Sequence, residues 1–202
     1  MELTADPAGF LGHDRIIEVD HPEIALLSAA LRGQARSEVE YAGVAFEWVR
    51  DRVAHSVDAH DPRVTVSASS VLRERVGLCY AKSHLLTALL RNQGIAAGLC
   101  YQRLGDPVSG YALHGLVAVH LNGRWHRQDP RGNKPGVDAR FSLGQERLAF
   151  EIVAERGEVD YPTIYAKPAP AVVSALESAD DVLRLCQGGL PDRLPRIGRV
   201  RP

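Results

Sequence analysis

The chain has 202 residues, of which 45% are hydrophobic and 24% are charged, and its 24 Lys and Arg residues almost balance its 25 Asp and Glu residues. A chain of this size and composition can bury a hydrophobic core without a metal or a disulfide, which excludes disorder as its main state. It has a net charge of −1, no apolar run near the ~20 residues of a membrane helix and no signal-peptide pattern at its start, so we expect it to bind neither nucleic acid nor membranes.

An irregular or strand-containing lead-in over residues 1–22 is predicted to precede two helices. A short strand over residues 16–19 precedes a helix over 22–31. Apolar residues then recur at alternating intervals of three and four residues over 39–53, which predicts an amphipathic helix. Ser37 is its predicted N-cap, and Glu40, three residues later, completes a capping box.

Two further helices are expected after a predicted loop. A short helix begins at Ser69 and ends before Gly77. An apolar helix then begins at Cys79 and ends at Gly94, because glycine readily adopts the left-handed conformation that commonly follows a helix.

The middle of the chain changes to the pattern of strands. Strands are predicted over residues 95–104, 111–121 and 124–129. Asn122-Gly123, between the last two, is the strongest hairpin signal in the chain, because both residue types tolerate the positive φ of a type I′ turn.

The last third of the chain is less regular. A short helix over residues 144–149 and a strand over 150–153 are expected, followed by one helix over 171–186 whose apolar residues recur at intervals of four and three. Residues 188–202 are rich in Pro and Arg, and we expect them to form a surface tail.

Cys79 differs from the two other cysteines by its position at a helix start. The first turn of a helix has unpaired N–H groups and the positive end of the helix dipole, and both favour a reactive thiolate. The same N–H groups can bind the oxyanion that forms when a thiolate attacks a carbonyl. Gly77 would let the chain turn sharply and approach a substrate. Cys79 is therefore the candidate nucleophile, whereas Cys100 and Cys186 are most simply core residues.

The register of the predicted hairpin singles out one base among eight histidines. With a two-residue turn, His114 and Asp129 are diagonal neighbours on one face of the sheet. His120 shares this face but lies six residues further along the strand, and His126 points to the other face. His114 is thus the candidate base, and Asp129 is the group that orients it.

The order of these residues resembles that of the transglutaminase-like superfamily. The resemblance lies in residues 77–83 around the cysteine, 89–97 after its helix, 113–116 around the histidine and 123–133 leading to and following the aspartate. It covers the chain from about residue 40 to 150, and the segments look most like those of small bacterial transglutaminase-like domains.

The resemblance implies an α+β fold of the papain-like type, in which the helix that begins with the cysteine packs on an antiparallel sheet. It implies that the cysteine, histidine and aspartate act as nucleophile, base and orienting group. We expect a single compact domain with a lead-in and first helix over residues 1–36, a catalytic core over 37–165, and a helix with a tail over 166–202.

Gly77, Tyr80 and Ser83 are the candidate residues for binding the substrate or the oxyanion. Relatives include protein cross-linkers, proteases, deglycosylating amidases and members without catalysis, so hydrolysis and transamidation both stay open. Calcium activates larger transglutaminases, but the sequence contains no loop of the EF-hand type, and we expect no metal or other cofactor.

Other chemistries fit the sequence less well. A zinc site drawn from Cys79, His84, Cys100 and His114 would lack the usual paired spacing of ligands. Ser83 as a nucleophile would lack the nucleophile-elbow sequence. The main alternative to an enzyme is a binding module that retains the fold without turnover.

We therefore expect a cysteine-dependent enzyme that transfers an acyl group from a carboxamide or peptide bond through a thioester on Cys79. Its partners would be peptide, protein or small amide substrates. Three cysteines, a low and odd number, indicate free thiols and a cytoplasmic location rather than a disulfide framework.

Overall fold

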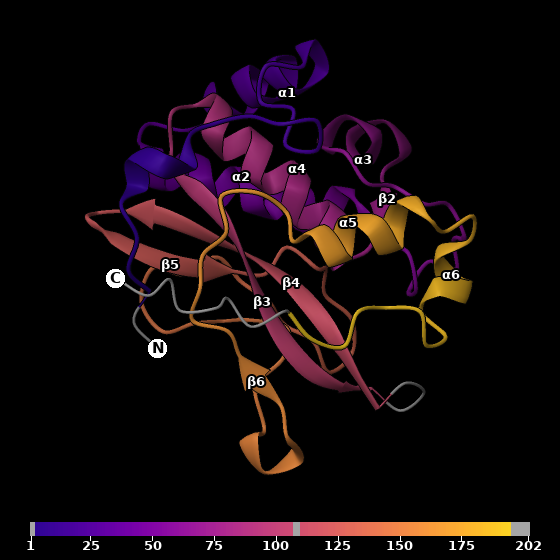
Figure 1. Cartoon of the computed structure of the whole chain (residues 1–202). Coiled ribbons are helices and arrows are strands. Elements are labelled where there is room, and N and C mark those ends of the chain that lie inside the picture. Colours follow the sequence, from indigo (N-terminus) through magenta and orange to yellow (C-terminus); the bar gives the residue numbers. More distant parts are fainter. Residues whose placement is uncertain (1–2, 107–109, 195–202) are drawn as a thin grey trace, which may run out of the picture.

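Helices occupy the first half of the chain, and an antiparallel sheet follows them (Figure 1). The structure, a computed structural model, describes residues 3–106 and 110–194. The helices of the first half are α1 (Pro22–Arg32), α2 (Glu38–Arg52), α3 (Ala68–Glu74) and α4 (Cys79–Asn92). The main sheet has the order β5-β4-β3-β6, formed by β3 (Ala97–Asp106), β4 (Gly110–Leu121), β5 (Arg124–Gln128) and β6 (Val159–Asp160).

Shorter elements complete the fold. A parallel pair joins β1 (Ala54–His55) to β2 (Val76–Gly77), directly before α4. The others are η1 (Pro7–Phe10), η2 (Ala154–Arg156), α5 (Pro170–Glu177) and α6 (Val182–Leu185). The helix that begins with Cys79 packs on the antiparallel strands β3 and β4, which confirms the predicted α+β class.

The sheet has a hydrophobic core on each face, because side chains alternate along a strand. On one face, Val117, Val119 and neighbouring apolar residues of β4 pack with the helices in the larger core. On the other face, Leu116 and Ala118 pack with a smaller cluster that includes Phe10. Figure 1 shows α4 lying over the sheet, with α1, α2 and α3 around it. α4 is therefore buried on all sides, and its residues from Cys79 to Arg91 are all buried.

Several local predictions are confirmed. α2 begins after Ser37, whose hydroxyl accepts the backbone N–H of Glu40, although the Glu40 carboxylate accepts the N–H of Arg36 rather than that of Ser37. The hairpin turn has φ of 52° at Asn122 and 76° at Gly123. The pairs from Val117–Gln128 to Leu121–Arg124 have the predicted register.

Four predictions of secondary structure are wrong. Residues 16–19 form turns instead of a strand, and residues 144–153 form neither the expected helix nor the expected strand. The helix expected over 171–186 is divided into α5 and α6, because Asp181 is extended and its carboxylate accepts N–H groups at the start of α6. Apolar residues recur at intervals of four and three across this break, so the sequence pattern did not reveal it.

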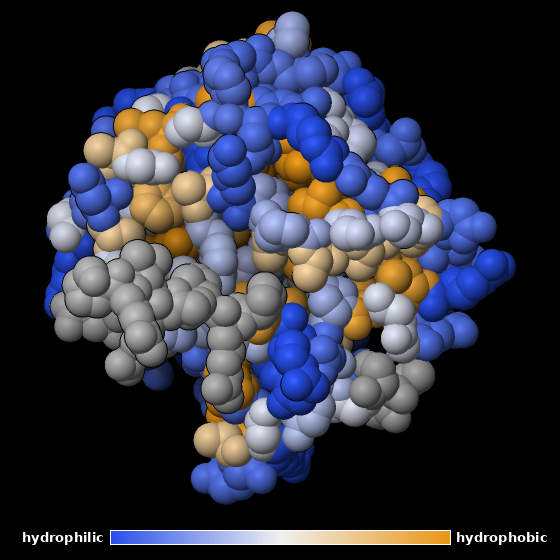
Figure 2. Space-filling view, in the orientation of Figure 1, coloured by the Kyte–Doolittle hydropathy of each residue, from blue (hydrophilic) through white to orange (hydrophobic). Residues whose placement is uncertain are grey.

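The described part of the predicted tail lies against the sheet. The Pro191 carbonyl accepts the backbone N–H of Leu113 on β4, and Leu194 is buried. Residues 195–202 lie outside the described residues. In the view of Figure 2, apolar side chains show in separate areas between hydrophilic ones. Within the described ranges, no helix is long and apolar enough to cross a membrane.

Candidate active site

Cys79 is the first residue of α4, and the start of this helix has no side-chain cap. Its N-cap residue, Leu78, is extended, with φ of −68° and ψ of 168°, and its apolar side chain accepts no hydrogen bond. The N–H groups of the first turn therefore have no capping oxygen. This leaves them able to bind an anion near the sulfur of Cys79.

The sulfur of Cys79 lies against strand β4. Gly115 donates its backbone N–H to Cys79 Sγ at 3.4 Å, at a point on β4 beyond its last pair with β5. A Cβ atom on Gly115 would lie 2.8 Å from Cδ1 of Tyr80, closer than real Cβ contacts. Glycine at this position thus lets the start of α4 come close enough to β4 for this contact.

His114 and Asp129 meet where β5 ends. His114 Nε2 lies 2.8 Å from Asp129 Oδ2. Asp129 follows the last residue of β5, so the strand is one residue shorter than predicted, although the two side chains meet as the register predicts. The Asp129 carboxylate also accepts the backbone N–H groups of Arg131 at 3.1 Å and Ala149 at 3.0 Å.

These three side chains are largely withdrawn from solvent, with exposed fractions of 7% for Cys79, 5% for His114 and 0% for Asp129. Burial lowers the pKa of His114, but the charges of Asp129 and Cys79, with hydrogen bonds to both, raise it overall to about 10. Burial opposes ionisation of Asp129, yet the charge of His114 and the hydrogen bonds hold the pKa of this carboxyl below its usual value. A protonated His114 between two acidic groups is the charge state that this arrangement favours.

The other three candidate residues, Gly77, Tyr80 and Ser83, contact neighbouring parts of the protein. Tyr80 is buried, and its hydroxyl donates to the Leu113 carbonyl on β4. Ser83 is also buried and donates to the Gly115 carbonyl at 3.3 Å. Both side chains join α4 to β4, and their contact with a substrate or an oxyanion stays a prediction. A Cβ on Gly77 would lie 2.9 Å from Oγ1 of Thr65, so close packing explains this glycine.

A cluster of charged and titratable side chains near Asp129, some buried and some exposed, was not found from the sequence. Arg131 and Lys134 bind Asp58, and the ring of His55 lies 3.9 Å from the same carboxylate. Burial and the charge of Arg131 lower the pKa of His55 to about 3, so its ring is neutral at pH 7. Its Nδ1 has no hydrogen-bond partner among the described residues.

Lys82 belongs to the same region. Its ammonium donates to the carbonyls of Arg50, at 3.1 Å, and Val53, at the end of α2. Burial, with the charge of Arg131, lowers the pKa of Lys82 to about 7. His55 comes from a segment in which no sequence motif indicates a site. Lys82 lies within the predicted apolar helix, and no motif distinguishes it from its neighbours. The fold alone brings both residues near Arg131, two residues after Asp129.

The structure separates the residues of the alternative zinc site. His84 Nδ1 lies 2.7 Å from the Val66 carbonyl, and Cys100 belongs to the smaller core on the other face of the sheet. Among the described residues there is no group of three or more His, Cys, Asp or Glu side chains placed to hold a metal ion. These positions do not form the zinc site considered from the sequence.

A family model described as the transglutaminase-like superfamily matches residues 26–130, just over half of the chain. The match includes all three residues from α4, β4 and the end of β5 described above. None of the curated proteins matches the sequence.

Solved structures have a similar fold. A candidate cysteine protease from Cytophaga hutchinsonii has a TM-score of 0.52 and 21% identity, over 64% of this chain and 43% of that chain. The periplasmic domain of TgpA from Pseudomonas aeruginosa has a TM-score of 0.47 and 19% identity, over 63% and 48% of the two chains. The chain thus spans less than half the length of these structures. At 21% identity, the likeness to the first of these structures shows the fold alone.

Proposed function

The chain belongs to the transglutaminase-like superfamily, and we propose that it is a cysteine-dependent acyl-transfer enzyme with Cys79 as nucleophile, His114 as acid and base, and Asp129 as orienting group. Its substrates would be peptides, proteins or small amides. The observation that carries this proposal is the contact of His114 Nε2 with Asp129 Oδ2 at 2.8 Å, next to Gly115, whose backbone N–H lies 3.4 Å from Cys79 Sγ at the start of α4.

In the first half of the reaction, the thiolate of Cys79 attacks the carbonyl carbon of the substrate amide. A C–S bond forms, and the carbonyl oxygen becomes an oxyanion near the N–H groups of the first turn of α4. The C–N bond then breaks, and protonated His114 gives its proton to the leaving amine. A thioester on Cys79 and a free amine result.

In the second half, water or another amine gives a proton to His114 and attacks the thioester. The C–S bond breaks, and the products are a carboxylic acid or a new amide and the thiolate of Cys79. Asp129, which accepts from His114 Nε2, keeps Nδ1 of the ring free to exchange protons at the reacting atoms and stabilises the protonated ring.

The binding-module alternative predicts no turnover. Cys79, His114 and Asp129 are all buried, and His114 is bonded to Asp129, so the three side chains present little surface to a binding partner, which favours an enzyme. Both proposals use the same fold, so the distinction rests on activity.

Substitution of the nucleophile tests the proposal. Cys79→Ala should abolish hydrolysis of amide and glutamine peptides and incorporation of a fluorescent amine into casein, because the covalent route requires the sulfur. His114→Ala should lower kcat/KM by a similar factor, since residues that act as a unit are not additive. Cys186→Ala, which removes a half-buried thiol that is not one of the three proposed catalytic residues, is the matched control and should retain activity. Equal activity of wild type and Cys79→Ala would overturn the proposal.

We also propose a cytoplasmic location, supported by the unpaired state of Cys79, Cys100 and Cys186. Cell fractionation with an antibody to the native chain tests it. Recovery of the chain in the periplasmic fraction would contradict this proposal without affecting the proposed chemistry.

A further inference from the structure

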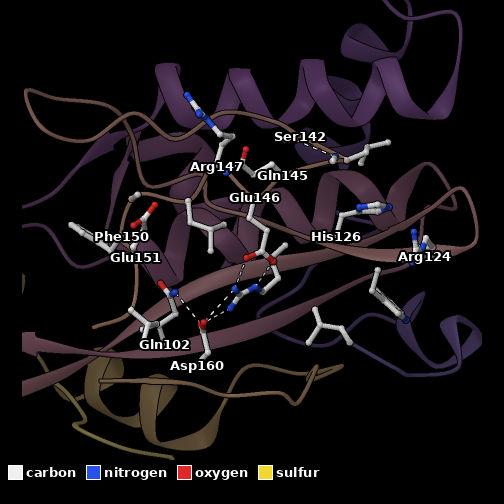
Figure 3. A pocket seen from close by; sticks show the side chains of 18 of the residues that line it. Gln102, Arg124, His126, Ser142, Gln145, Glu146, Arg147, Phe150, Glu151 and Asp160 are labelled. Atoms are coloured by element: carbon white, nitrogen blue, oxygen red, sulfur yellow. Dashed lines mark hydrogen bonds and ion pairs between the residues drawn. The ribbon is translucent and has the colours of Figure 1, made fainter. Parts of the chain in front are cut away.

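A polar pocket lies beyond His114, on the face of the sheet opposite the larger core. Its volume is about 1450 Å³, which is large enough for part of a peptide. Phe150 lines it and also contacts the ring of His114 edge to face, with ring centroids 5.2 Å apart. In Figure 3, Gln102 and Asp160 lie toward the Phe150 end of the pocket, while Arg124 and His126 lie toward the other end.

The strand register places one row of side chains across this end of the pocket. Gln102 on β3 is paired with His114 on β4 and with Asp160 on β6. Directly paired residues of antiparallel strands have Cβ atoms about 5 Å apart and point to the same face. The side chain of Gln102 is therefore the immediate neighbour of His114.

The amide of Gln102 has one free acceptor. Its Nε2 donates to Asp160 Oδ1 at 3.0 Å. Because an ionised carboxylate only accepts hydrogen bonds, this contact fixes which end of the amide is nitrogen. The oxygen, Oε1, has no hydrogen-bond partner among the described residues, although Gln102 is 1% exposed. A buried acceptor without a donor is costly, so a ligand that supplies an N–H group would stabilise it.

The charges around Gln102 favour a cation. Arg127, which is 5% exposed, binds Asp160 and donates to both oxygens of Glu146, at 2.8 and 2.5 Å. Two carboxylates thus surround one guanidinium, and the protonated ring of His114 beside Gln102 is paired with the carboxylate of Asp129, which leaves a net charge of −1 at this end. The complete lining contains three arginines against four carboxylates, so the excess remains negative over the pocket as a whole.

We propose that this pocket binds a positively charged ammonium or guanidinium group of the substrate, which donates to Gln102 Oε1 and lies near the carboxylates of Asp160 and Glu146. This inference rests on the proposed function and names its substrate class: amides that carry a cationic side chain close to the reacting carbonyl. Since Gln102 is the cross-strand neighbour of His114, a group bound there lies beside the residue that exchanges protons with the amide.

Binding to Cys79→Ala tests the inference without turnover. The probes are acetyl-glycyl-lysine amide, its arginine counterpart, and the norleucine and glutamate peptides of the same length, titrated by calorimetry. A hydrogen bond to a charged group corresponds to an affinity ratio of about tenfold or more, so the lysine or arginine peptide should bind at least about tenfold more tightly than the norleucine peptide. The glutamate peptide should bind most weakly. The lysine and arginine arms distinguish ammonium from guanidinium.

Two variants, each combined with Cys79→Ala, locate the preference. Gln102→Met keeps the length of the side chain but removes the acceptor, and should reduce the preference for the cationic peptide to about twofold or less. Glu146→Gln keeps a hydrogen-bonding group for Arg127 and removes one negative charge, and should reduce the preference severalfold. Its side chain is 40% exposed, so this variant should fold even if the first one does not. Gln93→Met, at the end of α4, is the matched control and should leave the preference unchanged.

Equal binding of the four peptides would overturn the inference, as would a cation preference that survives both Gln102→Met and Glu146→Gln. These outcomes are separate from failure of the proposed function. If wild type turns over no amide but its Cys79→Ala variant binds cationic peptides through Gln102, the pocket stands and the catalytic proposal falls. If wild type turns over amides but the peptides show no cation preference, the catalytic proposal stands and the pocket inference falls.

Discussion

Protonation of His114 should change the stability of the protein by a measurable amount. Its pKa is raised to about 10 in the folded state by the charges of Asp129 and Cys79, which outweigh burial, whereas an unfolded histidine titrates near ~6.5. A raised pKa means that the folded state binds the proton more tightly. The resulting stabilisation is complete below pH ~6.5 and disappears as the pH rises to about 10.

We therefore expect the melting temperature of wild type to exceed that of His114→Asn by several degrees at pH 6, and the difference to shrink steadily up to pH 10. Thermal unfolding of both proteins across this range measures it. Lys82, whose pKa of about 7 also places its titration in this range, is present in both proteins and cancels in the comparison. A difference that stays constant from pH 6 to 10 would show that His114 is not charged in the folded state.

The three cysteines should differ sharply in reactivity. Burial raises the pKa of Cys186 to about 11 and raises that of Cys100 still further, so both stay protonated at neutral pH. Cys79 instead lies at the start of α4, whose first-turn N–H groups have no capping side chain, and we expect it to react first. Iodoacetamide at pH 7 should label Cys79 first, and mass mapping of the labelled peptides measures the order. Labelling that begins at Cys186 would contradict this charge arrangement.

At the scale of elements, the approach of α4 to β4 depends on Gly115. A methyl group there would lie 2.8 Å from the ring of Tyr80 and 3.2 Å from its Cα atom. The helix start and the strand must then separate, which moves Cys79 Sγ away from the Gly115 N–H. Gly115→Ala should lower the free energy of unfolding by roughly 1–3 kcal/mol and lower kcat/KM by a larger factor than this loss of stability explains.

Gly123→Ala is the matched control for this prediction. Gly123 has φ of 76° in the hairpin turn, and nothing lies within 4 Å of the added Cβ. The substitution should cost about 1 kcal/mol of backbone strain but leave the active-site geometry intact. Denaturant unfolding and kcat/KM should therefore separate the two variants. A Gly115→Ala protein with full activity would show that α4 and β4 need not be this close.

At the scale of the whole molecule, Arg91 joins distant parts of the chain. Its guanidinium donates to the carbonyls of Ala97, Gly12 and Ala166, at 2.8, 2.6 and 2.7 Å. Burial lowers the pKa of Arg91 to about 10, so the residue is charged at pH 7 despite being 5% exposed. One side chain of α4 thus holds the segment before α1 and the segment before α5 to the core.

Arg91→Met should lower the free energy of unfolding by roughly 2–5 kcal/mol, because three buried carbonyls lose a charged donor. Both segments should also become accessible to limited proteolysis near residues 12 and 166. Arg184→Met, at an exposed site on α6, is the control and should change stability by less than about 0.5 kcal/mol. Unchanged proteolysis of Arg91→Met would show that other contacts hold these segments.

Local physics made part of this fold predictable from the sequence. The Asn122-Gly123 turn sets its own register, because few residue pairs adopt positive φ at both positions, and that register predicted the contact of His114 with Asp129. The Ser37 cap of α2 and the start of α4 at Cys79 were also predictable from residues close together in the sequence. Such signals act over a few residues, so a single sequence displays them.

Only the tertiary structure decided which distant groups surround these residues. Asp129 accepts from Ala149, which lies in a segment without regular structure, and His55 comes from well upstream of α4. Gln102 gains its place beside His114 from the pairing of β3 with β4. No periodicity encodes these contacts, because they depend on how whole elements pack rather than on the spacing of neighbouring residues. The sequence by itself therefore determined the local elements and the contact of His114 with Asp129, and packing decided the environment that sets their charge.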